Sequence, residues 1–162
     1  MNIPIGKVVE EHQSFSGNDP FAKMEKLLKS GFNGYLVATI EGVTGLEEGV
    51  LMMKQSQVVG VVFDALRVNK QLYGLKALRL VLNILKAKKG VFDVNRLSKQ
   101  QIDLIMAFNE KIRLPKEVDR SIMLKLKPSE YKADLVSKEL AVDLSQKDTR
   151  YNLLKKLGLG SI

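Results

Sequence analysis

The sequence of 162 residues contains no cysteine and only one histidine, His12. The absence of cysteine excludes disulfide bonds, thiol catalysis and zinc sites of the cysteine type. His12 is the only imidazole that could serve as a general base or metal ligand, and its place between Glu11 and Gln13 near the terminus is typical of a surface residue. We therefore expect no enzyme activity, no metal ion and no other cofactor.

Long apolar runs are also missing, and none approaches the ~20 residues that a membrane span needs. The first residues, MNIPIGKVVEEH, lack a basic segment followed by an apolar stretch and a small-residue cleavage site. Hydrophobic residues make up 45% of the chain and charged residues 27%, which is typical of a folded globular protein. We expect a cytoplasmic protein that does not bind membranes.

Motifs for phosphate binding and acid–base catalysis are missing as well. A phosphate-binding loop needs closely spaced glycines that lead from a strand into a helix. Gly42, Gly45 and Gly49 come nearest, but they lie between two expected strands, which favours a role in turns. Glu47 and Glu48 are adjacent carboxylates, and neighbouring residues of a strand point to opposite faces. This pair is therefore unsuited to joint acid–base work.

Acidic residues are absent from one long stretch, although the whole chain carries 26 Lys and Arg against 18 Asp and Glu, a net charge of +8. No Asp or Glu occurs between Asp64 and Asp93. The basic residues of this stretch, which we predict to bind a partner, are Arg67, Lys70, Lys76, Arg79, Lys86, Lys88 and Lys89. Acidic residues gather elsewhere, so the molecule should be polarised if these segments reach different faces.

The basic stretch fits a solvated lysine-rich face, a surface for an acidic protein, or a surface for nucleic acid. Several phosphate contacts would be available to RNA or DNA. However, exposed aromatic residues are not interleaved with the lysines, and no helix-turn-helix, KH or RNP signature is recognisable. We expect an adaptor that binds an acidic protein partner, with nucleic-acid binding as the alternative. A homodimer also fits, because small sheet domains often pair edges or helices.

Two helices have clear boundary signals. Asp19 is placed to cap the first, Pro20 occupies its first position, and Gly31 follows its last turn. Ser98 and Gln101 form the capping-box pattern that opens the second. These signals predict helices over residues 19–31 and 99–110.

A third helix is expected over residues 72–86 and is apolar on almost every side. Apart from Gly74, its polar positions are Lys76, Arg79, Asn83 and Lys86, at spacings of 3, 4 and 3. They form one narrow stripe. We expect this helix to be nearly surrounded by protein and to expose only a cationic edge.

The segments after Gly34 change to a period of 2 or to unbroken apolar runs, which predicts a sheet. Gln55-Ser56-Gln57 is short enough for a hairpin, so the strands should form a meander. Gly60 suggests a bulge or a close approach of another backbone, although an ordinary packing glycine fits equally well. The predicted strands are 3–9, 35–40, 49–54, 58–65 and 91–94.

The chain after Pro115 is basic and charge-rich. Residues 122–127 alternate as a strand would, and helices are expected at 130–139 and 146–157. Forty-seven residues bury too little apolar surface to fold alone. We therefore predict an α+β domain at 1–114, in which an antiparallel sheet is covered by about three helices, and a C-terminal strand and helix appendage at 115–162.

The order of five short motifs is similar to the PATAN-like pattern. There, a glycine-led strand pair precedes a strand ending near Phe-x-Ala, a helix opened by Gly-x-x-Ala and a closing Gly-x-Phe strand. The segments that carry the resemblance are FNGYL (32–36), EGVL (48–51), VGVVFDA (59–65), YGLKAL (73–78) and GVFDV (90–94). The chain also resembles an uncharacterised archaeal family with the same order, including an Asn that matches Asn109. The resemblance covers about residues 1–114.

The resemblance implies a non-catalytic module. PATAN proteins are typically attached to response-regulator or other signalling parts and are thought to mediate protein contacts. This chain departs from the pattern because it has no receiver domain and carries a basic tail after Pro115. No functional residues are carried over from the family.

Overall fold

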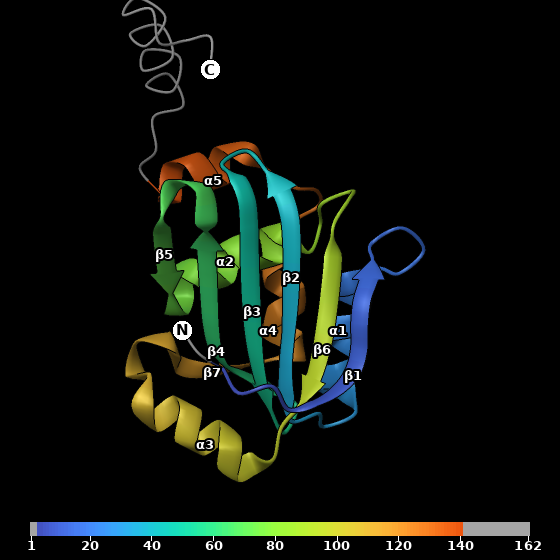
Figure 1. The fold of residues 1–162 in the computed structure, drawn as a ribbon, viewed down its shortest axis with the longest axis vertical. Coiled ribbons are helices and arrows are strands. Elements are labelled where there is room, and N and C mark those ends of the chain that lie inside the picture. Colours follow the sequence, from blue (N-terminus) through green and yellow to red (C-terminus); the bar gives the residue numbers. More distant parts are fainter. Residues whose placement is uncertain (1–2, 141–162) are drawn as a thin grey trace, which may run out of the picture.

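The structure, a computed structural model, describes residues 3–140 and has an α+β fold built on one antiparallel seven-stranded sheet (Figure 1). The strand order is β1-β6-β2-β3-β4-β5, and β7 also pairs with β4. The strands are β1 (Lys7–Ser14), β2 (Gly34–Gly42), β3 (Gly45–Lys54), β4 (Gln57–Ala65), β5 (Lys70–Tyr73), β6 (Val91–Arg96) and β7 (Arg113–Asp119). The helices are α1 (Pro20–Lys29), η1 (Leu66–Val68), α2 (Gly74–Ile84), α3 (Lys99–Phe108), η2 (Glu110–Ile112), α4 (Arg120–Leu126) and α5 (Ala133–Glu139).

The predicted meander is confirmed in β2, β3 and β4, and the short strand β5 extends it. Gln55 and Ser56 form the two-residue turn between β3 and β4, and both have left-handed backbones, with φ of 48° and 69°. Positive φ at both positions matches the right-handed twist of the paired strands. A register shift beside Gly60 leaves Val59 as the extra residue of β4, so the bulge, one of the three alternatives for Gly60, is present.

Strand β6 lies between β1 and β2, although it follows both of them in the sequence. The hydrophobic pattern predicted a strand here but not this position. Strand β1 forms the outer edge, and it starts later than the predicted strand at 3–9. Two register shifts interrupt its pairing with β6. Such bulges disfavour edge-to-edge pairing with another chain.

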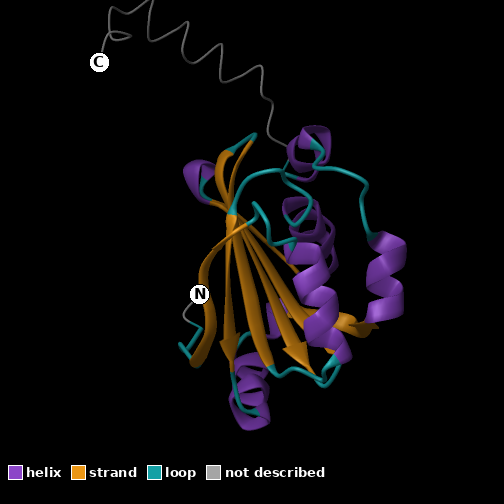
Figure 2. Cartoon of the chain, turned by 90° about the vertical axis from the view of Figure 1, so that its right-hand side faces the viewer, coloured by secondary structure: helices purple, strands orange, loops and turns teal. Residues whose placement is uncertain are grey.

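Helices α1, α2 and α4 cover one face of the sheet, which we call the covered face (Figure 2). Helix α2 packs on β3 and β4, and Gly49 of β3 leaves room for Val81: a Cβ on Gly49 would stand 2.8 Å from a Val81 methyl carbon. Phe63, Leu80 and Met123 are among the fully buried side chains of this core. Burial of these large apolar surfaces is the main source of stability.

The other face, which we call the open face, is covered only near the end where α3 lies (Figure 1). A second, smaller core forms there between the sheet and α3, and Ile102, Ile105 and Met106 contribute to it. The capping box of Ser98 and Gln101 that predicted α3 is complete. Both predicted helix starts are thus confirmed, since the Asp19 carboxylate accepts hydrogen bonds at the start of α1.

Two predictions for the middle and end of the chain are wrong. The helix expected from residue 72 begins at Gly74, because Leu72 and Tyr73 pair with β4 as part of β5. Residues 122–127, expected as a strand, lie largely in helix α4, which Asp119 caps by accepting a hydrogen bond from the Ile122 N–H. The helix expected at 146–157 lies outside the described residues.

The segment after Pro115 shares the core of the sheet. Pro115 lies within β7, which pairs with β4. Met123, Val136 and Leu140 are buried in the same core as β2, β3 and α2. The prediction of an appendage underestimated this packing, because it rested on the apolar area that these residues could bury alone. Against the sheet they bury more.

Candidate docking groove

Two hollows adjoin at the end of the sheet where β2 turns into β3, the upper end in Figure 1. One measures about 600 Å³ and lies between this turn, the end of β1 and the start of β6. The other measures about 610 Å³ and lies between the same turn and η1. Both contain Glu41 and Leu46, so they form one surface. We call it the hairpin groove and define it by Glu41, Leu46, Leu66, Arg67, Lys88, Lys89 and Val91.

Three large apolar side chains of the hairpin groove are partly exposed to solvent. Leu46 is 51% exposed, Leu66 49% and Val91 41%. Scattered exposed apolar residues are normal, but a group that lines adjoining hollows is typical of an interaction site. These three residues escaped the sequence reasoning because they end or begin buried elements, where an apolar residue fits the core pattern equally well.

The turn between β2 and β3 is held in place from its other side by a buried carboxylate. Glu47 is 0% exposed, and it accepts hydrogen bonds from the Thr44 N–H at 3.1 Å, the Thr44 hydroxyl at 2.9 Å and the Tyr131 hydroxyl at 3.0 Å. The Tyr131 hydroxyl also accepts a hydrogen bond from the Val43 N–H at 3.1 Å. Burial and the Glu47 charge raise the pKa of Tyr131 to about 12. Tyr131 therefore remains a hydrogen-bond donor at neutral pH.

Arg67 reaches the groove because Gly45 leaves space for it. Gly45 has φ of +97°, a backbone conformation that glycine adopts without strain. A Cβ there would stand 2.7 Å from Cδ of Arg67. The aliphatic part of Arg67 therefore packs on the hairpin, and Arg67 is an exposed residue of the groove lining.

The seven predicted partner-binding residues do not form one surface. Arg67, Lys88 and Lys89 line the hairpin groove. Lys86 is half-buried just after α2. The other three, Lys70, Lys76 and Arg79, lie along β5 and α2.

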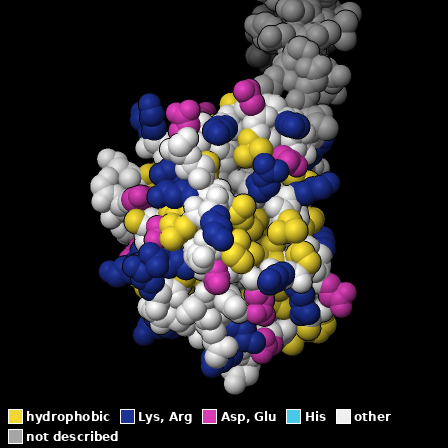
Figure 3. Space-filling view, turned by 180° about the vertical axis from the view of Figure 1, so that it is seen from behind, with side chains coloured by type: hydrophobic (Ala, Val, Ile, Leu, Met, Phe, Trp, Pro, Cys, Tyr) yellow, Lys and Arg dark blue, Asp and Glu magenta, His cyan; other side chains and the backbone are white. Residues whose placement is uncertain are grey.

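The C-terminal part of the described chain contacts Lys70 of β5 and two of the four residues of the polar stripe predicted on α2, Arg79 and Asn83. Lys70 donates to the Leu140 carbonyl oxygen at 2.7 Å, and Arg79 lies 3.9 Å from the Glu139 carboxylate. Asn83 is fully buried. Its side chain donates a hydrogen bond to the Lys132 carbonyl oxygen and accepts one from the Lys132 backbone N–H. The stripe is therefore interrupted by contacts within the chain, and Figure 3 shows basic side chains scattered over this side rather than gathered in one patch.

Two carboxylates lie side by side on the open face. Glu48 and Asp64 are paired across β3 and β4 beside a cavity of about 200 Å³, which Tyr35 also lines. Burial raises the pKa of Glu48, the charge of Asp64 raises it further, and a hydrogen bond with Thr39 opposes both effects. Burial and the nearby charge of Asp93 raise the pKa of Tyr35. Glu41, however, lines the hairpin groove together with Arg67, Lys88 and Lys89, so the acidic and basic segments do not reach fully separate faces.

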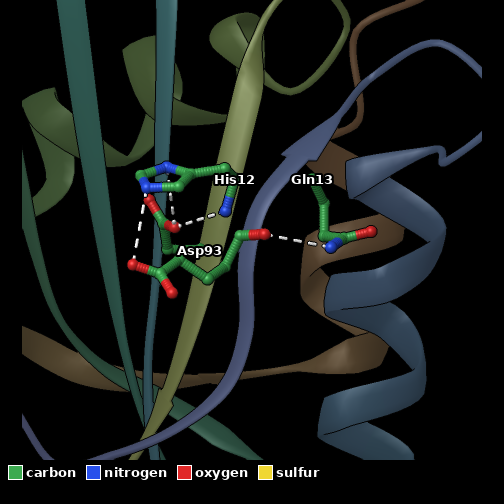
Figure 4. A network of polar contacts seen from close by, with 4 residues as sticks. His12, Gln13 and Asp93 are labelled. Atoms are coloured by element: carbon green, nitrogen blue, oxygen red, sulfur yellow. Dashed lines mark hydrogen bonds and ion pairs between the residues drawn. The ribbon is translucent and has the colours of Figure 1, made fainter.

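The only histidine lies on this side, on the edge strand β1 (Figure 4). The His12 N–H donates to Asp93 Oδ1 at 2.7 Å, and the imidazole lies 3.7 Å from Asp93 and 3.4 Å from Glu11. Its φ of 51° places it in the irregular part of β1. The side chain is 77% exposed, which fits the surface role predicted for it.

Residues 3–140 provide no group of three or more His, Cys, Asp or Glu side chains placed to hold a metal ion. Within the same residues, none of the helices has both the length and the hydropathy to cross a membrane. The hairpin groove is therefore the candidate site that combines a hollow shape, exposed apolar side chains and predicted basic residues.

Residues 1–109 of the 162-residue chain match the model of a family described as "Uncharacterized protein conserved in archaea (DUF2226)". This chain belongs to that family. The matched part contains every residue of the hairpin groove, whereas β7, α4 and α5 lie beyond it. No curated protein and no solved structure is significantly similar to the chain.

Proposed function

We propose that this protein is a non-catalytic interaction module of the PATAN-like type, an adaptor that binds an acidic protein partner in the cytoplasm. The observation that carries the proposal is the hairpin groove, where Arg67, Lys88 and Lys89 flank exposed apolar side chains. Apolar contacts supply affinity at such surfaces, and the flanking charges supply selectivity and speed of association. The resemblance to modules that mediate protein contacts in signalling supports the same function.

Nucleic acid is the less favoured partner. A phosphate backbone requires several cations spaced along one track, but Lys70 and Arg79 contact the end of the described chain instead. Single-stranded nucleic acids also need aromatic side chains on which bases stack. The groove-lining residues contain leucine and valine but no aromatic side chain. Apolar hollows rimmed by lysine and arginine suit a polypeptide better.

Binding of the 162-residue chain to a labelled acidic peptide tests the proposal, with mixed-sequence RNA and double-stranded DNA as competitors at about 50 mM salt. The Lys88→Glu/Lys89→Glu variant should lose at least about tenfold in peptide affinity. The Lys26→Glu/Lys99→Glu variant is the matched control, because it makes the same charge change at exposed lysines of α1 and α3. Equal losses in both variants, or stronger binding of RNA or DNA than of peptide, would contradict the proposal.

A further inference from the structure

The arrangement of charge along the hairpin groove indicates which acidic segments it can bind. This inference rests on the proposed function. The groove has two outer ends and a shared centre. Lys88 and Lys89 are at one end, Arg67 is at the other, and Glu41 and Leu46 line both hollows. The sign of the charge therefore alternates from positive to negative to positive along the groove.

The outer ends favour carboxylates. Lys88, Lys89 and Arg67 are exposed, and a bound carboxylate would gain from their charges without first having to leave water completely. Arg67 can hold a carboxylate through two parallel hydrogen bonds, which a lysine cannot do. Its stem is already packed on Gly45, so less side-chain freedom remains to be lost on binding.

The centre disfavours a carboxylate and favours an apolar side chain. Leu46 presents about half of its surface there, with Leu66 on one side and Val91 on the other. A ligand carboxylate at this point would meet the like charge of Glu41. An apolar ligand side chain would instead cover Leu46 and remove both surfaces from water.

We propose that the hairpin groove recognises an extended acidic segment in which an apolar residue is bracketed by acidic residues on both sides. The acidic residues contact Arg67 at one end and Lys88 and Lys89 at the other, and the apolar residue packs on Leu46. Glu41 acts as the selectivity element, because it rejects segments whose acidic run is unbroken at the centre.

Three synthetic peptides test this inference on the full chain by fluorescence anisotropy. Two have the same composition and net charge: four aspartates and two leucines, with the leucines central in one and terminal in the other. The third contains aspartate alone. The bracketed peptide should bind at least about tenfold more tightly than the segregated one. Glu41→Gln should reduce the preference for the bracketed peptide over the all-aspartate peptide severalfold, mainly by improving binding of the latter.

Leu46→Ser should weaken the bracketed peptide most, and Leu104→Ser, at an exposed leucine of α3, is the matched control. Thermal unfolding of each variant shows whether it is folded. The inference is overturned if the bracketed and segregated peptides bind equally, or if Glu41→Gln leaves the preference for the bracketed peptide over the all-aspartate peptide unchanged. In that case acidic binding that still depends on Lys88 and Lys89 would leave the proposed function standing. Failure of all three peptides to bind would overturn both.

Discussion

The two faces of the sheet give two neighbouring glutamates different environments. Glu47 and Glu48 are neighbours in β3, but Glu47 points to the covered face and Glu48 to the open face. Glu47 is completely buried and accepts hydrogen bonds from Thr44 and Tyr131. Glu48 is half-buried beside a second carboxylate, Asp64, and its pKa is raised. The groups next to a carboxylate, hydrogen-bond donors or another carboxylate, matter more than burial alone for whether it stabilises the fold.

The contrast extends to the apolar cores. Helices α1, α2 and α4 pack on the covered face, whereas on the open face α3 covers only one end of the sheet (Figure 2). The carboxylates of the open face are half-buried. Because stability follows buried apolar area, the covered face should carry most of it. Four pairs of variants test this difference.

The largest effect is expected for Met123→Ala in α4. Met123 is fully buried against the covered face, so its truncation removes apolar contacts and leaves a cavity. The free energy of unfolding should fall by about 2–5 kcal/mol, measured by urea denaturation. Leu124→Ala, at the next and exposed position, should cost less than about 0.5 kcal/mol. Similar losses for the two variants would show that α4 does not pack as described.

Two glycines give the next comparison, because each lies in the sheet and faces an opposite side. A Cβ on Gly49 would meet branched Val81 at 2.8 Å, whereas one on Gly60 would meet the flexible end of Met106 at 3.1 Å. Gly49→Ala should therefore cost about 1–3 kcal/mol of stability, and Gly60→Ala under about 1 kcal/mol. Adding Val81→Ala should recover part of the Gly49→Ala loss. A larger loss of stability for Gly60→Ala than for Gly49→Ala would contradict this expectation.

Tyr131→Phe tests the polar network of the covered face. It leaves the Val43 N–H without its acceptor and removes one of the donors to Glu47, and should cost about 1–2 kcal/mol at pH 7. The folded pKa of Tyr131, about 12, exceeds its ordinary value of 10.0, so the stabilisation is complete below pH 10 and is lost as the pH rises toward 12. The difference from Phe should shrink in that window. Tyr73→Phe, whose hydroxyl bonds an exposed Gln71, serves as the control.

Glu48→Gln on the open face should have the smallest effect and the opposite sign. The folded pKa of Glu48 is raised, so its contribution is favourable while it is protonated and is lost as the pH rises through that pKa. The neutral amide escapes this loss and should slightly raise the free energy of unfolding at pH 7. The gain should vanish in acid, where wild-type Glu48 is protonated. Glu41→Gln at an exposed position is the control, and a clear loss at pH 7 for Glu48→Gln would contradict the assignment.

Local signals predicted the parts of the fold that depend on neighbouring residues. Asp19 and Pro20 located the start of α1, and Ser98 with Gln101 located that of α3, because caps act within one turn. The alternation at 122–127 failed because its apolar residues pack on α1 and the sheet from a helix, and the Asp119 cap that marks this helix was overlooked. The charge pattern identified the seven basic residues, but it did not predict which residues surround them in space.

The sequence by itself determined the class of fold, the meander, the absence of cysteine chemistry and the basic character of residues 67–89. These properties depend on composition or on contacts within a few residues. Only the tertiary structure decided that β6 lies between β1 and β2, that Lys70 and Arg79 are engaged by residues 139 and 140, and that Arg67 meets Leu46 at a groove. These depend on contacts between residues far apart in the chain, for which a single sequence carries no periodic signal.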